Sequence, residues 1–440
     1  MVASAFPASA GKIVVTGIGL STALGFGVEQ NWKRLLAGES AVAEQPAESF
    51  PLPLTMPPVL AARIDRAVLA ARIREAVPRQ IWNTSEECCH LWLLTALEAL
   101  EQAGLAEQDN SPPERVGVYA GTGAGSAQFT EQEFINIFTA EKAVHRDVSR
   151  LAVLKYMASS LAGQLSLLRG FRGPCLTINT ACASGATALL TALDALRLGR
   201  VDCAVAGGVD LCVVGGVIKG FHKLGALTMR TELGARACRP FAAERDGIAL
   251  GDGAGCLVLE REESARKRGR PALACLLGGA ATSDAFSLLA PREDGTDQAR
   301  TMVLALDDAG LPAERVAHVY AHGTGTRYND ACEARALEQV CGLRPTLSAT
   351  KALLGHTIGA AGAIDAVLAV LSLNAGQVVP MIHLDAPDPD CAISPALAAE
   401  QPALGKANRA AVLVNSFAFG GHNACLAFAL MHPAGKEANP

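Results

Sequence analysis

Short apolar runs of strand length recur along the chain, and longer stretches rich in Ala and Leu lie between them. Strand-like runs in the first part of the chain stand at 12–17, 116–120, 175–178, 203–206 and 256–259. Stretches of helical length cover 89–103 and 186–198. Strands that alternate with helices are typical of layered α/β folds, in which helices cover the faces of a sheet. The pattern therefore predicts an α/β fold.

A basic, polar segment at 261–270 interrupts this alternation, which then starts again. Strand-like runs follow at 272–277, 316–320 and 411–414. Polar segments at 105–115 and 285–300 are predicted to be loops. We therefore divide the chain into a first half, residues 1–268, and a second half, residues 269–440.

The two halves resemble each other around one residue in each. Cys182-Ala-Ser-Gly185 opens an Ala- and Leu-rich helix after a strand-like run, and His356-Thr-Ile-Gly359 does so in the second half. After each helix we expect a strand that ends in a Gly-Gly pair, Gly207-Gly208 in the first half and Gly420-Gly421 in the second. If the halves arose by duplication, Cys182 and His356 occupy equivalent helix starts and face each other across a pseudo-two-fold axis.

The composition fits a folded protein with a large, tightly packed core. Of 440 residues, 50% are hydrophobic, 18% are charged and 43 are Gly, with a net charge of -5. Neither a disordered chain nor a nucleic-acid binder has this balance. The longest apolar stretch, 355–373, contains His356 and Asp365, so it falls short of the ~18 uninterrupted residues of a membrane span. Residues 1–11 lack the features of a signal peptide, which predicts a cytoplasmic protein.

The chain has 13 cysteines, none of them in a CxxC pair. The histidines do not cluster with them at zinc spacing, so we predict no metal site. Most of these cysteines are expected to be small buried hydrophobic residues. Cys182 is considered separately because it begins a helix behind a strand, where exposed N–H groups and the helix dipole favour a thiolate. From its spacing alone, a structural cysteine in an Ala-rich core is an equal alternative.

Two histidines and one Gly-rich segment strengthen the catalytic interpretation of Cys182. His322 lies in the small-residue loop Ala321-His-Gly-Thr-Gly-Thr326 directly after a strand, and His356 begins a helix. The segment 415–423 is rich in Gly, and its successive backbone amides could form an oxyanion site. One Cys, two His and such a loop together match covalent acyl transfer on a thioester.

These segments resemble the β-ketoacyl-[acyl-carrier-protein] synthases of the elongating type, in the thiolase-like superfamily. The resemblance runs in the family's order from about residue 12 to residue 430. The matching motifs are Thr177-Ile-Asn-Thr-Ala-Cys-Ala-Ser-Gly185, Cys238-Arg-Pro-Phe241, Arg245-Asp-Gly-Ile-Ala-Leu-Gly-Asp-Gly-Ala-Gly255, His322-Gly-Thr-Gly-Thr326, Thr350-Lys-Ala-Leu-Leu-Gly-His-Thr-Ile-Gly-Ala-Ala-Gly362 and Asn415-Ser-Phe-Ala-Phe-Gly-Gly421.

The resemblance implies a thiolase-like five-layered αβαβα fold built from two similar half-domains. It also implies a decarboxylative Claisen condensation, in which an acyl-enzyme thioester and malonyl-acyl-carrier-protein give 3-oxoacyl-acyl-carrier-protein. The implied partners are an acyl carrier protein and a second subunit, either in a homodimer or in a heterodimer with a chain-length partner. No cofactor is implied, because the phosphopantetheine of the carrier protein holds the substrates.

Five residues match the catalytic positions of the family. Cys182 matches the nucleophile that takes the acyl chain. His322 and His356 match the pair that assists decarboxylation and stabilises the enolate, and Lys351 and Glu333 match the supporting charged residues. Loss of CO2 generates the carbanion, so two neutral imidazoles that donate hydrogen bonds suffice.

Other matching positions surround the substrate. The backbone N–H groups of Cys182 and Phe419 match the oxyanion hole. Thr324 and Thr326 match residues that hydrogen-bond the pantetheine arm. Phe419 matches a gate that opens when the nucleophile is loaded, and Phe417 is placed with it at the substrate.

The sequence departs from the family pattern at a few of these sites. Ala418 replaces a Gly before the gating Phe, and His422 replaces a Thr after the Gly pair, which leaves the behaviour of the gate open. Tyr320 replaces an Asn, Gly325 replaces a Ser, and Asn329-Asp330 replaces Gly-Asp. Some of these features resemble polyketide or polyene synthases and others fatty-acid enzymes, so the pathway stays open between the two.

Alternative interpretations remain. A thiolase would require a second catalytic Cys, and the thiol nearest to the C-terminal loop is Cys425. An initiating synthase would have Asn in place of His356. A non-catalytic chain-length partner would lack the nucleophile. The segment Gly121-Thr-Gly-Ala-Gly125 lacks the Lys of a phosphate-binding loop and is predicted to be a tight turn.

A locally basic run contains Arg63, Arg66, Arg72, Arg74 and Arg79. We expect either a solvated helix face or, together with Arg230, a surface that docks the acidic carrier protein.

Overall fold

Two five-stranded parts of a mixed sheet organise the protein, and they share one strand order. The computed structural model describes residues 11–46, 49–50, 58–105, 112–138, 149–395, 404 and 411–431. The first part has the order β6 (Cys175–Ile178), β5 (Val116–Gly121), β7 (Cys203–Leu211), β8 (Leu250–Arg261) and β1 (Ile13–Thr22). The second part has the order β11 (Thr346–Ser348), β10 (Val316–Tyr320), β12 (Ala411–Ala418), β13 (His422–Ala429) and β9 (Ala274–Ser283).

The strand directions repeat as well as the order. In each part the first three strands are parallel, and the fourth and fifth run antiparallel to their neighbours. The parts join where β1 pairs with β9, at Val14–Cys275 and Val15–Ala274. The chain passes from one part to the other through α10 (Glu262–Lys267). The topology therefore repeats between the two halves of the chain.

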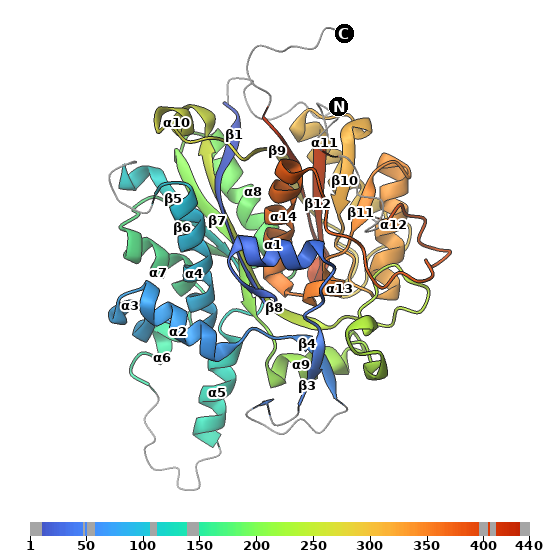
Figure 1. Ribbon diagram of the computed structural model, residues 1–440, viewed down its shortest axis with the longest axis horizontal. Helices are drawn as coiled ribbons and strands as arrows, with labels where there is room; N and C mark the ends of the chain where they lie inside the picture. Colours follow the sequence, from blue (N-terminus) through green and yellow to red (C-terminus); the bar gives the residue numbers. More distant parts are fainter. Residues whose placement is uncertain are drawn as a thin grey trace.

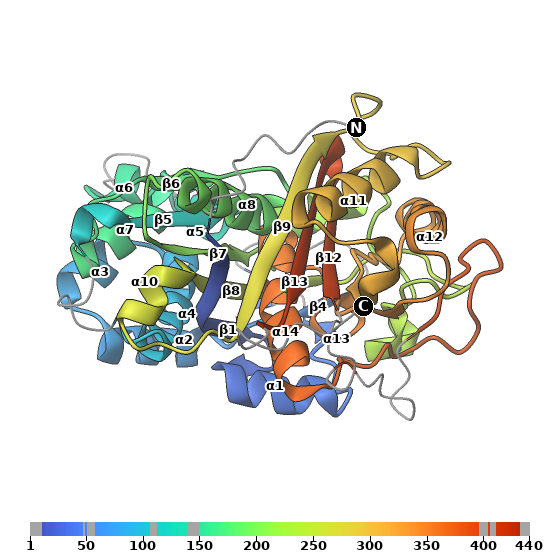
Figure 2. The same cartoon turned by 90° about the horizontal axis from the view of Figure 1, so that it is seen from above.

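Helices form three layers around the two parts of the sheet, which are called the first and the second sheet below (Figure 1). Helices α8 (Ser184–Arg197) and α14 (Ala361–Ala375) pack between the sheets. Helix α4 (Glu87–Gln102) covers the outer face of the first sheet, and α11 (Thr296–Ala309) and α12 (Arg327–Cys341) cover the second, as Figure 2 shows from above. The resulting order of layers is helix, sheet, helix, sheet, helix, which is the fold expected from the sequence.

Small residues make this layering tight. A Cβ atom at Gly19 of β1 would lie 2.0 Å from the carbonyl oxygen of Thr95 in α4, so only Gly allows this approach. The stretch Ile358–Ala375, which includes α14, is the one described helical segment long and apolar enough to cross a membrane, but 83% of it is buried inside the protein. It is the central core helix.

The other described elements surround this frame. They are β2 (Gly25–Phe26), α1 (Val28–Leu36), β3 (Ala43–Gln45), β4 (Val59–Ala62), α2 (Arg66–Ala76), α3 (Arg79–Thr84), α5 (Ala127–Phe138), α6 (Ala152–Tyr156), α7 (Ser160–Arg169), α9 (Gly215–Lys223), α13 (Lys351–Leu354) and short 3-10 turns.

Two local predictions were wrong. The segment 285–300 is not a loop throughout, because α11 begins at Thr296. Gly207 and Gly208 lie inside β7, whereas Gly420 and Gly421 form a turn after β12, so the Gly-Gly pairs are not equivalent. Of the segment predicted as a loop at 105–115, residues 106–111 lie outside the described residues.

Candidate active site

A cavity of about 480 Å³ opens where the two halves meet. Seven of the predicted site residues line it, and they come from both halves: Cys182, His322, Thr324, Thr326, His356, Phe417 and Phe419. Lys351 and Glu333 do not line the cavity. They are buried behind its wall, with 1% and 0% of their surfaces exposed.

Cys182 lies in the turn between β6 and α8. Ala181 before it has φ 50°, a left-handed conformation that is strained for a residue with a Cβ atom. The backbone N–H groups of Phe419 and of Cys182 itself donate toward the sulfur. These are the two donors that the sequence placed in the oxyanion hole.

The resting thiol of Cys182 differs from the thiolate expected at a helix start. Its side chain is only 4% exposed. This burial raises the pKa of Cys182 to about 12, against the opposing effects of Lys351 and the two N–H donors. Desolvation of the charged form outweighs the helix start, so the resting residue is a neutral thiol.

His356 is held in one tautomer by the backbone. The N–H of Ile358 donates to its Nδ1 atom over 3.2 Å, so the ring proton resides on Nε2. Gly355 before it has φ 65°, which repeats the left-handed residue that precedes Cys182. The turn thus presents an N–H donor from a fixed ring.

His322 follows β10, and its backbone is anchored by a buried carboxylate. The N–H groups of His322 and Gly323 donate to the two oxygens of Glu333 over 2.9 and 2.8 Å, and Asn415 Nδ2 donates to the same carboxylate over 3.1 Å. The ring of His322 lies 5.4 Å from that of His356, at 80° to it. Glu333 therefore places the His322 backbone, and the imidazole is left for the cavity.

Both histidines are neutral at neutral pH. Burial lowers the pKa of His322 and of His356 well below the usual value, and the positive charge of Lys351 lowers both pKa values further. The Nζ atom of Lys351 is buried and has no hydrogen-bond partner among the described residues. Burial also raises the pKa of Glu333 to about 7.

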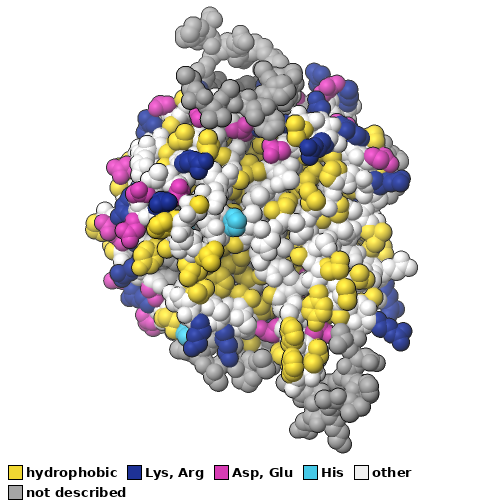
Figure 3. Space-filling view, turned by 180° about the vertical axis from the view of Figure 1, so that it is seen from behind, with side chains coloured by type: hydrophobic (Ala, Val, Ile, Leu, Met, Phe, Trp, Pro, Cys, Tyr) yellow, Lys and Arg dark blue, Asp and Glu magenta, His cyan; other side chains and the backbone are white. Residues whose placement is uncertain are grey.

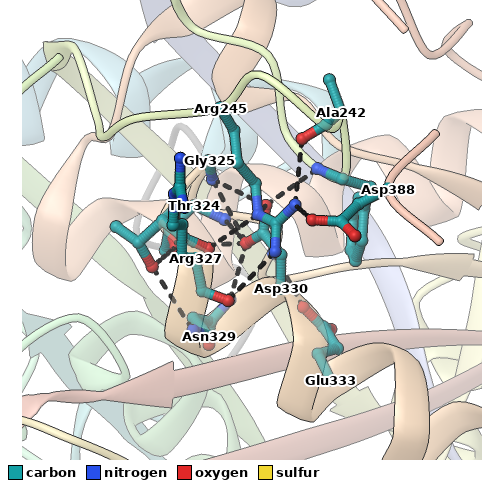
Figure 4. Close-up of polar contacts among 12 residues, drawn as sticks. Ala242, Arg245, Thr324, Gly325, Arg327, Asn329, Asp330, Glu333 and Asp388 are labelled. Atoms are coloured by element: carbon teal, nitrogen blue, oxygen red, sulfur yellow. Dashed lines mark hydrogen bonds and ion pairs between the residues drawn. The ribbon is translucent and has the colours of Figure 1, made fainter. Parts of the chain in front are cut away.

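The loop that carries Thr324 and Thr326 is anchored by a residue to which the sequence assigned no role (Figure 4). Asp330 accepts hydrogen bonds from the N–H groups of Thr324 and Gly325, over 2.9 and 3.1 Å. Arg245 lies 3.6 Å from Asp330 in a buried ion pair and also pairs with Asp388. The hydroxyl groups of Thr324 and Thr326 are 2.8 Å apart. This network fixes the loop at the cavity wall.

The predicted gate is connected to a second loop at the cavity mouth. The ring of Phe419 lies 6.2 Å from that of Phe221. The backbone N–H of Gly420 donates to the carbonyl oxygen of Leu288, and the backbone N–H of Asp284 donates to the carbonyl oxygen of Gly421. Ala418 has φ -110° and ψ 159°, an extended conformation open to any residue, so Ala is compatible with this position.

The other departure at the gate, His422, begins β13 with an exposed side chain. A Cβ atom at Gly420 would lie 3.0 Å from the His422 ring, so this ring packs against the turn that follows Phe419.

The second thiol required of a thiolase is not in this cavity. Cys425 is buried in β13 within the core of the second half and does not line the cavity. Among the residues that the structure describes, no group of His, Cys, Asp and Glu could hold a metal ion.

The two sheets and the Cys–His–His cavity define a ketosynthase of the thiolase-like class. The chain belongs to the β-ketoacyl synthase family: it matches the family's N-terminal domain over residues 10–265 and its C-terminal domain over residues 273–385. This confirms the predicted fold and enzyme class, an acyltransferase.

Known proteins resemble the chain over nearly its whole length. A 3-oxoacyl-[acyl-carrier-protein] synthase 2 of Vibrio cholerae is 33% identical over 96% of this chain and 99% of its own. One solved structure that matches is a type II PKS acyl-carrier protein in complex with its ketosynthase, bound to the hexaketide. The matching chain has a TM-score of 0.85 and 27% identity, over 96% of this chain and 100% of that chain. The ishigamide ketosynthase/chain length factor matches with TM-score 0.81 and 32% identity, over the same shares.

Proposed function

We propose that this protein elongates acyl chains carried on an acyl carrier protein. In the first step the Cys182 thiol attacks the carrier-bound thioester, the acyl group moves to Cys182, and the thiol proton leaves with the pantetheine thiol. In the second step malonyl carrier protein loses CO2, and the resulting carbanion attacks the acyl-Cys182 thioester. This attack expels the Cys182 thiolate, which takes up a proton from solvent, so the products are 3-oxoacyl carrier protein, CO2 and the regenerated Cys182 thiol.

Different residues at the cavity assist different parts of these two steps. The Nε2–H of His356 and the ring of His322 face the enolate oxygen and stabilise it as neutral donors. The N–H groups of Cys182 and Phe419 stabilise the tetrahedral oxyanion on the acyl thioester. Burial, reinforced by the positive charge of Lys351, keeps the histidines neutral.

The remaining site residues position the catalytic groups and the substrate and control access to the cavity. Glu333 holds the backbone of His322. Thr324 and Thr326 bind the pantetheine arm, and Phe417 and Phe419 close over the loaded acyl chain.

One observation carries this proposal: a buried Cys, two neutral histidines and two N–H donors share one cavity. Mass spectrometry after incubation with acyl carrier protein tests it. The wild-type protein should gain the acyl mass on Cys182, and Cys182→Ala should gain none. Cys182→Gln should decarboxylate malonyl carrier protein without condensation. An acylated Cys182→Ala protein would overturn the proposal, because another group would then be the nucleophile. A wild-type protein that gains no acyl mass would favour the non-catalytic chain-length role.

We propose that the carrier protein docks beside α9, and not on the basic run at 63–79. Arg66 of that run forms an ion pair with buried Asp252, and Arg72 and Arg74 lie over the rings of Phe26 and Trp82. Arg230 pairs with Glu232 and Glu244. These four side chains therefore already have partners in the protein, although Arg72 and Arg74 remain exposed.

Helix α9 offers an unpaired basic surface at the cavity mouth. Lys219 and Lys223 are exposed, and neither pairs with a carboxylate of the described residues. Leu224, just after the helix, is 53% exposed and lines the cavity. Hydrophobic side chains gather around a hollow on the face seen in Figure 3, with basic side chains near its lower edge. Acidic carrier proteins complement such a surface.

Charge reversal tests this docking site. Lys219→Glu with Lys223→Glu should raise KM for acyl carrier protein about tenfold at low salt and less at high salt. Lys33→Glu, an exposed lysine of α1, is the matched control. Equal KM values for the two variants would refute this docking site.

We further propose that the protein dimerises through the edge strand β6. This strand pairs only with β5 among the described strands, and Leu176 in it is 46% exposed. Leu167 on the adjacent α7 is 70% exposed. The solved ishigamide ketosynthase/chain length factor favours a heterodimer as one form of this assembly. Native mass spectrometry of the purified protein distinguishes a homodimer from a monomer that requires a partner, and Leu176→Asp should abolish either dimer.

We also propose cytoplasmic localisation and a boundary between the half-domains at residue 268.

The pathway, fatty-acid or polyketide synthesis, stays open because both use the same condensation. Product analysis with carrier proteins of both kinds distinguishes the two pathways.

A further inference from the structure

Asp210 is a buried carboxylate near the cavity to which the steps above assign no role. It lies in β7 with none of its surface exposed. Its Oδ1 atom accepts from the Thr122 hydroxyl over 2.7 Å and from the Ala124 N–H over 2.9 Å. Its Oδ2 atom accepts from the N–H groups of Gly123 and Gly359 over 2.8 and 2.6 Å. No Lys or Arg of the described residues forms an ion pair with it, so these four donors alone stabilise its charge.

The Oδ1 side of this carboxylate is connected to the turn of the nucleophile. The carbonyl of Thr122, the residue that donates to Oδ1, lies 3.1 Å from the Ser184 hydroxyl. The same hydroxyl lies 2.6 Å from the carbonyl oxygen of Ala181, the strained residue directly before Cys182. A shift of the Thr122 backbone is therefore transmitted to the residue that aims the sulfur.

The Oδ2 side is connected to the turn of the second histidine. Gly359, which donates to Oδ2, follows Ile358, and the N–H of Ile358 fixes the His356 tautomer. Ile358 has φ 45°, a second strained conformation with a Cβ atom. Strained residues persist only where their surroundings hold them, and the bond from Gly359 to Asp210 is the adjacent restraint.

The two turns approach each other closely around Asp210. A Cβ atom at Gly359 would lie 2.4 Å from the Gly123 backbone nitrogen and 2.7 Å from Asp210 Oδ2. The N–H groups of Gly123 and Gly359 therefore converge on one oxygen although they belong to different halves of the chain. Only an acceptor without its own hydrogen can satisfy both groups there.

We propose that Asp210 is a positioning residue whose carboxylate binds the Cys182 turn to the His356 turn, and that it thereby sets the distance between nucleophile and histidine. This inference rests on the proposed function, because it concerns the geometry of the same two reacting groups. Asp210 does not touch the cavity, and it acts through the two turns.

Asp210→Asn tests the proposal with minimal change of volume. An amide has one acceptor oxygen, so in either orientation its NH2 group faces at least one backbone N–H donor. We expect the two turns to separate and both partial reactions to slow about 10–100-fold, since small displacements of reacting groups have effects of this size. The readouts are the rate of Cys182 acylation and the rate of malonyl decarboxylation, with KM for each carrier substrate unchanged. Asp210→Glu, which keeps the carboxylate, should be faster than Asp210→Asn in both.

A matched control separates positioning from general stability. Asp308 also joins the two halves, since it accepts from Arg197 and from the N–H of Gly279, but it does not line the cavity. Asp308→Asn should lower the melting temperature and leave both partial rates at the wild-type level. If Asp210→Asn behaves as Asp308→Asn does, the proposal is wrong.

Two further outcomes keep this proposal distinct from the proposed function. If Asp210→Asn does not fold, Ser184→Ala tests the Cys182 side alone. Its acylation should be slower than in the wild-type protein, and its malonyl decarboxylation should not. An acylation rate equal to that of the wild-type protein would overturn the proposal. An acyl-enzyme in Cys182→Ala would overturn the proposed function whatever the Asp210 variants do. Loss of the acyl-enzyme in Cys182→Ala with wild-type rates in Asp210→Asn would overturn only the role of Asp210.

Discussion

Gly185→Ala tests how tightly the two central helices must approach. Gly185 lies in the first turn of α8, three residues after Cys182. An added Cβ atom would lie 2.8 Å from the carbonyl oxygen of Gly359 and 2.9 Å from the Cβ atom of Ala363 in α14. Ordinary contacts of these atoms are about 3.5 Å, so α8 and α14 would have to separate by roughly half an ångström. The Cys182 and His356 turns would move apart with them.

The expected cost follows from this overlap. Overpacking of a dense core costs about 1–3 kcal/mol. With an unfolding entropy of about 2.1 cal/mol/K per residue over the whole chain, this cost lowers the melting temperature by roughly 1–3 °C. Condensation should slow by about tenfold or more, because the reacting groups are displaced.

Gly163→Ala is the matched control in a helix of the same protein. Gly163 lies inside α7, and no atom stands within 4 Å of its added Cβ atom. Ala in a helix interior is favoured over Gly by about 0.5–1 kcal/mol, so this variant should be slightly more stable and fully active. Calorimetry and the rate of condensation measure both effects. A Gly185→Ala protein as stable and as active as Gly163→Ala would refute the reasoning.

Three further substitutions test the buried charges. Burial raises the pKa of Glu86 from 4.5 to about 7, so the stability it contributes is fully present below pH 4.5 and is lost as pH rises through 7. Glu86→Gln should therefore reduce the fall in stability between pH 4.5 and pH 8 by about 3 kcal/mol, measured by urea unfolding at both pH values. Lys351→Met removes the cation that lowers the pKa of both histidines, so the acid limb of the decarboxylation profile should move to higher pH; an unmoved limb would contradict this. Arg245→Met leaves Asp330 without its buried partner and should destabilise the protein by about 3–5 kcal/mol, with a melting temperature several degrees lower.

The elements of the fold were largely predictable because their signals are local. The apolar runs at 116–120, 203–206 and 316–320 correspond to β5, β7 and β10. The predicted end of the loop at 285–300 was wrong. The polar residues Thr296, Asp297 and Gln298 already belong to helix α11, whose apolar residues come only later in the sequence. The expectation that most cysteines are buried is confirmed, and Cys175 is the exception: it is exposed because β6 is an edge strand, and edges are defined by the topology of the sheet and not by composition.

The contents of the site were predictable from motifs, but its electrostatics were not. A helix start predicts a thiolate at Cys182, whereas burial, which depends on the whole fold, raises its pKa. Asp210 was missed for the same reason, because its four donors come from two distant segments. The signal that was available is a lone carboxylate within an apolar strand, two residues after the pair Gly207-Gly208.

The repeated topology accounts for the place of His322 in the second half. The loops after β5 and β10, 121–126 and 321–326, follow equivalent strands, and buried carboxylates hold both. In the first loop Thr122 gives its side chain to Asp210, so no side chain at that position is available to a substrate. In the second loop Glu333 reaches His322 from α12 and binds only its backbone N–H. Because the anchor comes from the helix and leaves the side chain unused, the loop 321–326 can present an imidazole to the cavity, whereas the equivalent loop 121–126 cannot. The loop 121–126, which the sequence suggested was only a tight turn, is therefore the structural counterpart of the His322 loop.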